Sequence, residues 1–223
     1  MKRLKKSYFN FSVVLSLLII LSICSSDMIA ISHEGQVKEK LTLEEAEEII
    51  DIFLNNPTAE NFKIIKETIY PILSRDDPEN ISLVNKLLFY CVLEGERSWI
   101  IEYEIFTGNR FMALFARKLL DFSDGASTEA LLGIFGELVR LNPELYLTIF
   151  KEDINKPVLE GTVTGTYFLE ETVKKPIFLE GTDKYQKYER YDLIKRIEAL
   201  KSVTDPELRR VRDYCIRILE NEL

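Results

Sequence analysis

The stretch LNPELYL, residues 141–147, predicts the start of an α-helix and sets the fold class of this chain. Asn142 is a good N-cap residue, because its side chain can accept a hydrogen bond from a backbone amide that has no partner inside the helix. Pro143 loses nothing at the first helical position, where its missing N–H would be unpaired in any case. Glu144 adds a negative charge near the positive end of the helix dipole.

Further helix starts carry the same kind of signal. Thr42 and Glu45 have the spacing of a capping box, in which each side chain pairs with a backbone amide of the first turn. Pairs of an N-cap residue with proline recur at Asn56-Pro57, Asp77-Pro78 and Asp205-Pro206. These starts predict a chain of short helices.

Apolar residues follow these starts at intervals of three and four, which is the spacing of one face of a helix. Pro71 is expected to kink or end the second helix. Gly133 and Gly136 lie inside a helical pattern at a cost of about 1 kcal/mol each relative to alanine, which predicts a close contact between helices. The sequence therefore predicts an all-α domain over residues 41–223, an array of short antiparallel helices. The apolar faces are Leu43, Ala46, Ile50, Phe53 and Leu54; Phe62, Ile65, Ile69 and Ile72; and Leu208, Val211, Cys215, Ile218 and Leu219, with further helices predicted at 81–94, 98–106, 110–122, 128–141 and 188–202.

Residues 156–184 interrupt the helical pattern and are expected to form an irregular excursion. Three glycines, two prolines and several threonines argue against a continuous helix. The run TVTGTYF, residues 162–168, has the composition of a short hairpin or an irregular loop. LEGT occurs at 159–162 and again at 179–182, which indicates either a duplication or a coincidence. As the longest irregular segment, it is the first candidate for a functional loop.

The N-terminus has the three parts of a secretory signal peptide. A positive start, Lys2 to Lys6, precedes an apolar run of 14 residues, Phe11–Cys24, and small polar residues follow it. A membrane-spanning helix needs about 20 apolar residues, so the run favours a cleaved signal over a permanent anchor. We therefore expect a signal over residues 1–24, a flexible tail over residues 25–40, and export to the periplasm, the cell envelope or the medium.

Cys24 is a candidate lipidation site. The sequence LSIC, residues 21–24, resembles the lipobox of bacterial lipoproteins, whose cysteine carries a lipid anchor and becomes the new N-terminus. Ile23 departs from that pattern, which has Gly, Ala or Ser before the cysteine. Ordinary cleavage after Ser26 or Ala30 is the alternative, and an uncleaved anchor is a third interpretation.

The chain is acidic once the signal is set aside. Residues 25–223 carry 25 basic and 37 acidic side chains, a net charge of −12. Residues 25–150 hold 11 of these basic and 22 of these acidic side chains. Such a charge repels phosphate backbones, so nucleic acid is not expected as a partner. A membrane is expected only through the N-terminal signal or a lipid on Cys24.

Two cysteines follow the signal, Cys91 and Cys215, and both fall within the apolar stripes of predicted helices. A buried free thiol is the usual state of such a residue. A disulfide between the two is the alternative in an exported protein, and it requires the two helices to touch.

The last predicted helix pair, residues 198–220, resembles a HEAT-type helical repeat. Asp205-Pro206 opens its second helix, and apolar residues follow where such repeats place similar ones. The resemblance implies stacked helix pairs that present a surface to another protein. Residues 108–147 are similar to uncharacterised exported bacterial helical proteins, from which no activity and no functional residue carries over.

The residue content excludes several classes of catalytic site from the predicted domain. His33 is the only histidine and lies in the predicted tail, so HExxH zinc sites and Ser-His-Asp or Cys-His sites lack their base. The sequence contains no CxxC pair, no EF-hand loop and no phosphate-binding glycine loop. No metal, cofactor or catalytic residue is therefore expected.

Glu102 and Glu104 are the remaining candidates for chemistry, because a glycosidase needs only two carboxylates and sugar clefts use aromatic rings. They lie beside Trp99 and Tyr103. The preferred interpretation is that Trp99 and Tyr103, four residues apart on one helix face, are a core pair with exposed acids between them.

The sequence favours a non-catalytic helical protein that binds a protein partner in the bacterial cell envelope. Arg210, Arg212, Lys174 and Lys175 are candidates for a surface that meets an acidic partner or anionic lipid, with a solvated face as the alternative. A carboxylate-based hydrolase of envelope sugars is one alternative function. A carrier of a small molecule or lipid in an apolar cavity between the helices is another.

Overall fold

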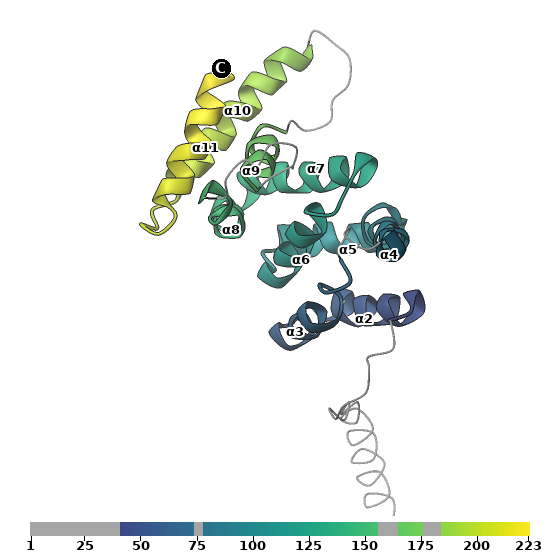
Figure 1. The fold of residues 1–223 in the computed structure, drawn as a ribbon. Helices are drawn as coiled ribbons and strands as arrows, with labels where there is room; N and C mark the ends of the chain where they lie inside the picture. The colour runs from purple at the N-terminus through teal and green to yellow at the C-terminus, as the bar shows by residue number, and fades with distance from the viewer. Residues whose placement is uncertain (1–40, 74–77, 156–164, 176–183) are drawn as a thin grey trace, which may run out of the picture. The chain divides into compact units, whose positions relative to one another are not determined.

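Helices are the only regular elements in the residues that the computed structural model describes, which are 41–73, 78–155, 165–175 and 184–223 (Figure 1). The predicted all-α class is confirmed, while the HEAT-type character of the last helix pair stays a prediction. The elements are α2 (Leu43–Asn55), α3 (Ala59–Thr68), α4 (Pro78–Leu88), the π-helix η1 (Phe89–Leu93), α5 (Gly95–Phe106), α6 (Arg110–Leu120), α7 (Gly125–Leu141), α8 (Pro143–Phe150), the 3₁₀ turn η2 (Asp153–Asn155), α9 (Gly165–Lys174), α10 (Lys184–Ser202) and α11 (Arg209–Asn221).

Two of the predicted helix starts have the expected caps. At α2 the Thr42 hydroxyl accepts from the Glu45 amide, and the Glu45 carboxylate accepts from the Thr42 amide at 2.8 Å. At α8 the Asn142 side chain accepts from the Leu145 amide at 3.1 Å, with proline at the first helical position. Local side-chain chemistry therefore sets where these helices begin.

Two other predicted starts are wrong, one by two residues and one by three. Asn56 ends α2, and the N-cap of α3 is Thr58, whose hydroxyl accepts from the Asn61 amide. Asp205 accepts from the Glu207 amide in a turn, so α11 begins only at Arg209. In each case an Asx or threonine oxygen binds an amide close by, and the proline lies before the helix instead of inside it. Asp77 lies outside the described residues, and α4 begins at the proline that follows it.

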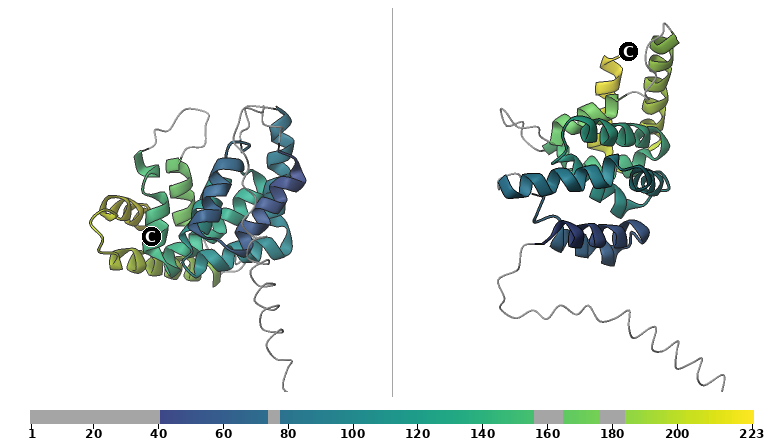
Figure 2. Two further views of the ribbon diagram at one scale, coloured as in Figure 1. Left: turned by 90° about the horizontal axis from the view of Figure 1, so that it is seen from below. Right: turned by 90° about the vertical axis from the view of Figure 1, so that its right-hand side faces the viewer.

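The core forms around α7, which packs against α5, α6, α8, α9 and α10 (Figure 2). The apolar faces predicted for α2, α3 and α11 are largely buried, and α3 ends at Thr68, three residues before Pro71 as expected. Cys91 and Cys215 are buried free thiols, so the prediction of free cysteines is confirmed and no disulfide joins them. Residues from Leu41 onward form one compact unit.

The expected excursion over residues 156–184 is wrong at its centre. Residues 165–174 form α9, whose Phe168, Leu169 and Val173 are buried in the core. The short hairpin or irregular loop expected in TVTGTYF is therefore wrong from Gly165 onward, where α9 begins, and residues 162–164 lie outside the described residues. Helical burial of these apolar residues outweighs the low helix propensity of glycine and threonine. Both LEGT copies lie outside the described residues.

One of the two glycines of α7 has the close contact that the sequence predicts. Gly136 lies against the end of α9, where an added Cβ would come 2.9 Å from the carbonyl oxygen of Lys175. Gly133 has no neighbour within 4 Å of such a Cβ, so the prediction is wrong at that position. The helix–helix contact is therefore confined to one point of α7.

A buried ion pair joins α6 to the segment that follows α8. Arg117 is 7 % exposed and donates through Nε and Nη2 to Oδ2 of Asp153, at 3.0 and 2.8 Å. Its Nη1 also donates to Asp121 at 2.5 Å. Phe150 and Phe168 lie beside the guanidinium, with their ring centroids 5.2 and 5.3 Å away. These contacts satisfy the charge of Arg117 where water cannot reach it.

Candidate functional site

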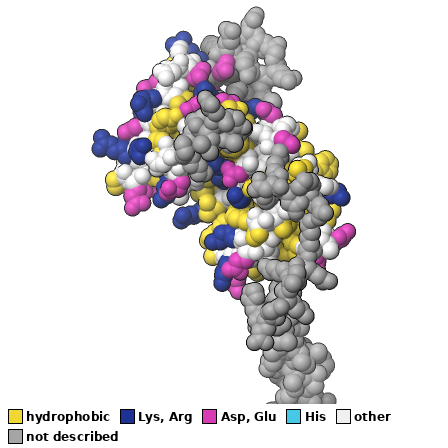
Figure 3. Space-filling model, in the orientation of Figure 1, with side chains coloured by type: hydrophobic (Ala, Val, Ile, Leu, Met, Phe, Trp, Pro, Cys, Tyr) yellow, Lys and Arg dark blue, Asp and Glu magenta, His cyan; other side chains and the backbone are white. Residues whose placement is uncertain are grey.

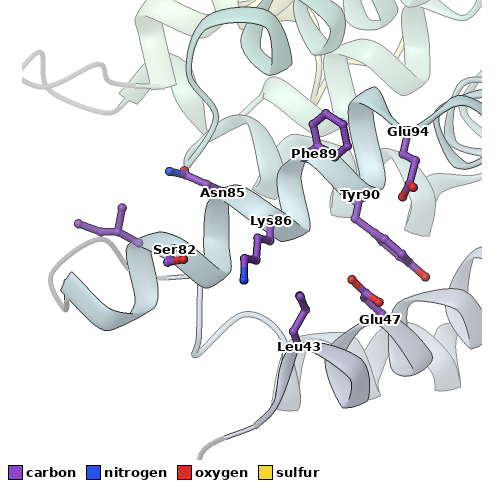
Figure 4. A pocket seen from close by; sticks show the side chains of 9 residues that line it. Leu43, Glu47, Ser82, Asn85, Lys86, Phe89, Tyr90 and Glu94 are labelled. Carbon is purple, nitrogen blue, oxygen red and sulfur yellow. The ribbon is translucent and has the colours of Figure 1, made fainter.

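An open groove of about 740 Å³ lies between α2 and α4. Leu43 and Glu47 on α2 point toward α4, and Lys86 and Tyr90 point back toward α2 (Figure 4). Glu94, just beyond the π-helix, also lines the groove. The lining thus combines apolar and aromatic side chains with polar and charged ones, among them Ser82, Asn85 and Lys86, a mixture that binding sites commonly have.

Phe89, the first residue of the π-helix η1, is among the residues that line this groove, and its ring lies on the side of the helix away from Lys86 and Tyr90 (Figure 4). The Glu94 amide donates to the Phe89 carbonyl at 3.0 Å, a bond from residue i+5 to residue i that widens the helix by one residue per turn. Tyr90, Cys91 and Val92 are buried, whereas Phe89 is 57 % exposed. π-Helical turns inside α-helices are frequent at functional sites, because they re-aim side chains that a regular helix would bury.

An ion pair holds Tyr90 in place beneath the groove. Arg97 on α5 donates from Nε and Nη2 to the two carboxylate oxygens of Asp51 on α2, at 2.9 and 3.1 Å. Its guanidinium carbon lies 3.7 Å from the centroid of the Tyr90 ring, a cation–π contact. The hydrogen bond from Arg97 lowers the pKa of Asp51, and burial together with a hydrogen bond to Asp51 raises the pKa of Tyr90 to about 12. Both groups therefore keep one protonation state at neutral pH.

The acidic charge of the chain is concentrated in its first half, and near the groove α2 carries it, with five acidic and no basic side chains, whereas α4 and η1 have no net charge. Residues 41–109 contain 14 acidic and 5 basic side chains, so they hold −9 of the net −12 of residues 25–223. Glu44 and Glu48 are exposed on the same helix as Glu47, and none of the three forms an ion pair within the described part of the chain. The groove therefore lies in a field of negative charge.

The sequence did not reveal the groove, although one signal was present. Leu87–Leu93 is a run of seven consecutive apolar residues, which is more than one face of an amphipathic helix can bury. Such a run requires either a helix that is buried all round or an exposed apolar side chain. The packing of the neighbouring helices decides which side chain stays exposed, and here it is Phe89.

The preferred interpretation of Trp99 and Tyr103 is wrong. They share one face of α5, but they are 76 % and 67 % exposed, and the core side of the helix is made by Ile101 and Ile105. The chain's one tryptophan therefore lies at the surface.

Glu102 and Glu104 do not form a pair of facing carboxylates. Two positions apart on α5, they project to different sides of the helix. Glu102 is exposed, and Glu104 accepts a hydrogen bond from Asn109 Nδ2 at 3.0 Å. The geometry of two acids across a cleft, which a glycosidase requires, is absent at these residues.

The two lysines of the candidate basic surface lie at the C-terminal end of α9. Lys174 forms an ion pair with Glu222 at 3.4 Å. Lys175 forms one with Glu129 on α7. Acidic partners within the chain therefore reduce the positive charge that these lysines offer to a ligand.

The two arginines of that surface lie on α11, which packs against α9. Arg212 donates to the Val203 carbonyl at 2.7 Å and to Asp213 at 2.8 and 2.9 Å, while Arg210 is exposed. Lys and Arg side chains gather over α10 and α11 among acidic ones (Figure 3). A surface for an acidic partner stays a prediction.

No group of histidine, cysteine, aspartate or glutamate residues in the described ranges is arranged to hold a metal ion. Among the same residues, no helix is both long and apolar enough to cross a bilayer. No protein family, curated protein or solved structure matches this chain. The candidate function therefore rests on the groove and its surroundings.

Proposed function

We propose that this protein is an exported, non-catalytic binding protein of the bacterial cell envelope, and that it docks a segment of another protein in the groove between α2 and α4. The observation that carries the proposal is Phe89, which the π-helix leaves 57 % exposed at the groove. Large aromatic side chains at the centre of a contact surface commonly supply much of the binding energy.

The shape of the groove supports a polypeptide ligand. It is open to solvent, so a docked segment can place a few side chains inside while its backbone stays at the surface. A small molecule or lipid carrier uses a cavity that buries most of the ligand, and this groove does not enclose one. The rigid support from Asp51 and Arg97 lowers the entropy that docking costs, because Tyr90 is already fixed.

The docking is tested by a photoreactive phenylalanine analogue placed at residue 89 of the full chain in living cells. The matched control carries the same analogue at Leu141, which is 49 % exposed at the end of α7. We expect irradiation to yield a discrete adduct with one protein from position 89 and none from position 141. Absence of an adduct at position 89, or the same adducts from both positions, contradicts the proposal.

The proposed export is supported by the positive start and the apolar run that ends at Cys24. Its test is the intact mass and N-terminal peptide of the protein from membrane and soluble fractions. A chain that begins at Cys24 and carries the mass of diacylglyceryl and acyl groups is a lipoprotein. An unmodified chain that begins near Asp27 or Ile31 is a free exported protein. A chain that retains its first 24 residues in the cytosol contradicts export.

A further inference from the structure

We infer that the partner segment is basic: an amphipathic helix that carries lysine or arginine beside its apolar stripe. This inference rests on the proposed docking in the groove and adds the chemistry of the ligand. An amphipathic helix laid in an apolar groove is a common mode of peptide recognition.

The apolar part of the ligand is set by the lining. Leu43 on α2 faces the groove, and Ile81, Phe89 and Tyr90 contribute from α4 and η1. Ile81 and Phe89 are 38 % and 57 % exposed, so their burial by a partner releases water from apolar surface. A volume of about 740 Å³ holds a few side chains, which fits one stripe of a helix and not a whole helix.

The charged residues that line the groove predict the charge of the ligand. Glu47 and Glu94 line the groove, and Lys86 is the only basic residue among the described residues that line it. Arg97, which lies 3.5 Å from Glu94, already donates to both oxygens of Asp51. Glu47 has no ion-pair partner among the described residues, so it can receive a cation from outside, whereas Glu94 is already paired with Nη1 of Arg97.

The charge around the groove disfavours acidic ligands. Residues 41–109 hold most of the net negative charge, and Glu44 and Glu48 extend it along the exposed side of α2. An acidic peptide, an anionic lipid surface or a nucleic acid would bring like charges together at this surface. A basic segment is attracted at long range and gains charge-assisted hydrogen bonds on contact.

The test uses two synthetic helical peptides with the same leucine stripe, one flanked by lysines and the other by glutamates. Binding of each labelled peptide to the full chain is followed by fluorescence anisotropy. We expect the lysine peptide to bind at least about tenfold more tightly than the glutamate peptide. An increase in salt from about 50 to about 300 mM should weaken the binding of the lysine peptide several-fold, because salt screens the attraction between exposed charges.

Matched variants locate the binding. Glu47→Gln with Glu94→Gln removes two acids from the groove, and Glu152→Gln with Glu207→Gln removes two exposed acids elsewhere, so the net charge changes equally. We expect the first pair of substitutions to weaken the binding of the lysine peptide at least about fivefold, and the second pair to weaken it less than about twofold. Phe89→Ser should abolish binding with no loss of helical circular dichroism, because the side chain is exposed.

The outcomes separate this inference from the proposed docking. If both peptides bind equally and Phe89→Ser abolishes the binding of both, the inference of a basic ligand is wrong, while the proposed docking in the groove stands. Equal weakening by both pairs of substitutions shows general attraction to an acidic protein and overturns the inference. If neither peptide binds but position 89 still cross-links to one protein in cells, the basic ligand is wrong and the docking stands. If that adduct is also missing, both the basic ligand and the proposed docking are wrong.

Discussion

Gly136 lies so close to Lys175 that a methyl group on its Cα would come 2.9 Å from the Lys175 carbonyl oxygen and 3.2 Å from the Lys175 Cβ. The carbonyl of Thr172 is 3.3 Å from the same point. Two of these atoms belong to the backbone, which cannot rotate aside as a flexible side chain can. The absence of a side chain at Gly136 is therefore what allows α7 and α9 to pack at this distance.

Gly136→Ala is expected to lower the free energy of unfolding by about 1–3 kcal/mol, because the added methyl group overpacks the contact with α9. Gly133→Ala is its matched control. No atom lies within 4 Å of the Cβ position there, so alanine should raise stability by up to about 1 kcal/mol through its higher helix propensity. Urea unfolding followed by circular dichroism measures both. Equal stabilities of the two variants would show that the close contact does not exist.

Arg117→Ala is expected to cost about 3–5 kcal/mol of unfolding free energy, because it removes the buried guanidinium that donates twice to the carboxylate of Asp153. Lys195→Ala breaks the exposed ion pair with Glu198 and should cost far less than Arg117→Ala, because exposed pairs are screened by water. Chemical denaturation of both variants gives the comparison. A loss at Arg117 no larger than that at Lys195 contradicts a buried ion pair.

Cys91 and Cys215 are expected to resist thiol reagents in the folded protein. Burial raises the pKa of both thiols, so the reactive thiolate is scarce and the reagent cannot reach it. A chromogenic disulfide reagent should titrate neither thiol in native buffer and both in concentrated guanidinium. Rapid titration of either residue without denaturant contradicts the burial, and a melting temperature lowered by reductant contradicts the free state.

Helix starts could be predicted from sequence where the decisive interaction is local. Thr42 and Asn142 each bind an amide three residues away, so their neighbours contain all the information that is needed. The start of α11 was misplaced because the Asp205-Pro206 pair fits a turn as well as a helix. Only packing against the rest of the chain decides between the two.

The orientation of α5 could not be predicted, because this helix carries two apolar faces. Trp99 and Tyr103 lie on one, and Ile101 and Ile105 lie on the other. Spacing alone shows that each pair shares a face, but the neighbouring helices determine which face is buried. The groove was out of reach for the same reason, since it depends on α2 and α4 lying side by side.

Trp99 is expected to behave as a solvent-exposed indole. Its fluorescence should be quenched by iodide in the native state nearly as efficiently as after unfolding, because 76 % of the residue is exposed. Trp99→Ala should change the free energy of unfolding by less than about 0.5 kcal/mol, as is usual for surface positions. Protection from iodide, or a loss of several kcal/mol, would restore the core pair that the sequence suggested.

The ion pair of Asp51 with Arg97 is expected to make a pH-dependent contribution to stability. Arg97 lowers the pKa of Asp51 in the folded chain, so protonation of this group favours the unfolded chain as pH falls. The contribution is complete above the unfolded pKa of about 3.9 and is lost as pH falls through the lower folded pKa. Its size is about 1 kcal/mol or less, because Asp51 is partly exposed.

Asp51→Asn tests this sign. Asparagine keeps the shape of the side chain and loses its charge, so the variant should be less stable than the parent at pH 7 and nearly equal to it at about pH 2. Glu48→Gln, an exposed change on the same helix without a salt bridge to lose, is the control and should show a smaller difference at pH 7. A stability difference for Asp51→Asn that stays constant down to pH 2 would mean that the charge of Asp51 does not hold Arg97. Tyr90 would then lack the support that fixes the floor of the groove.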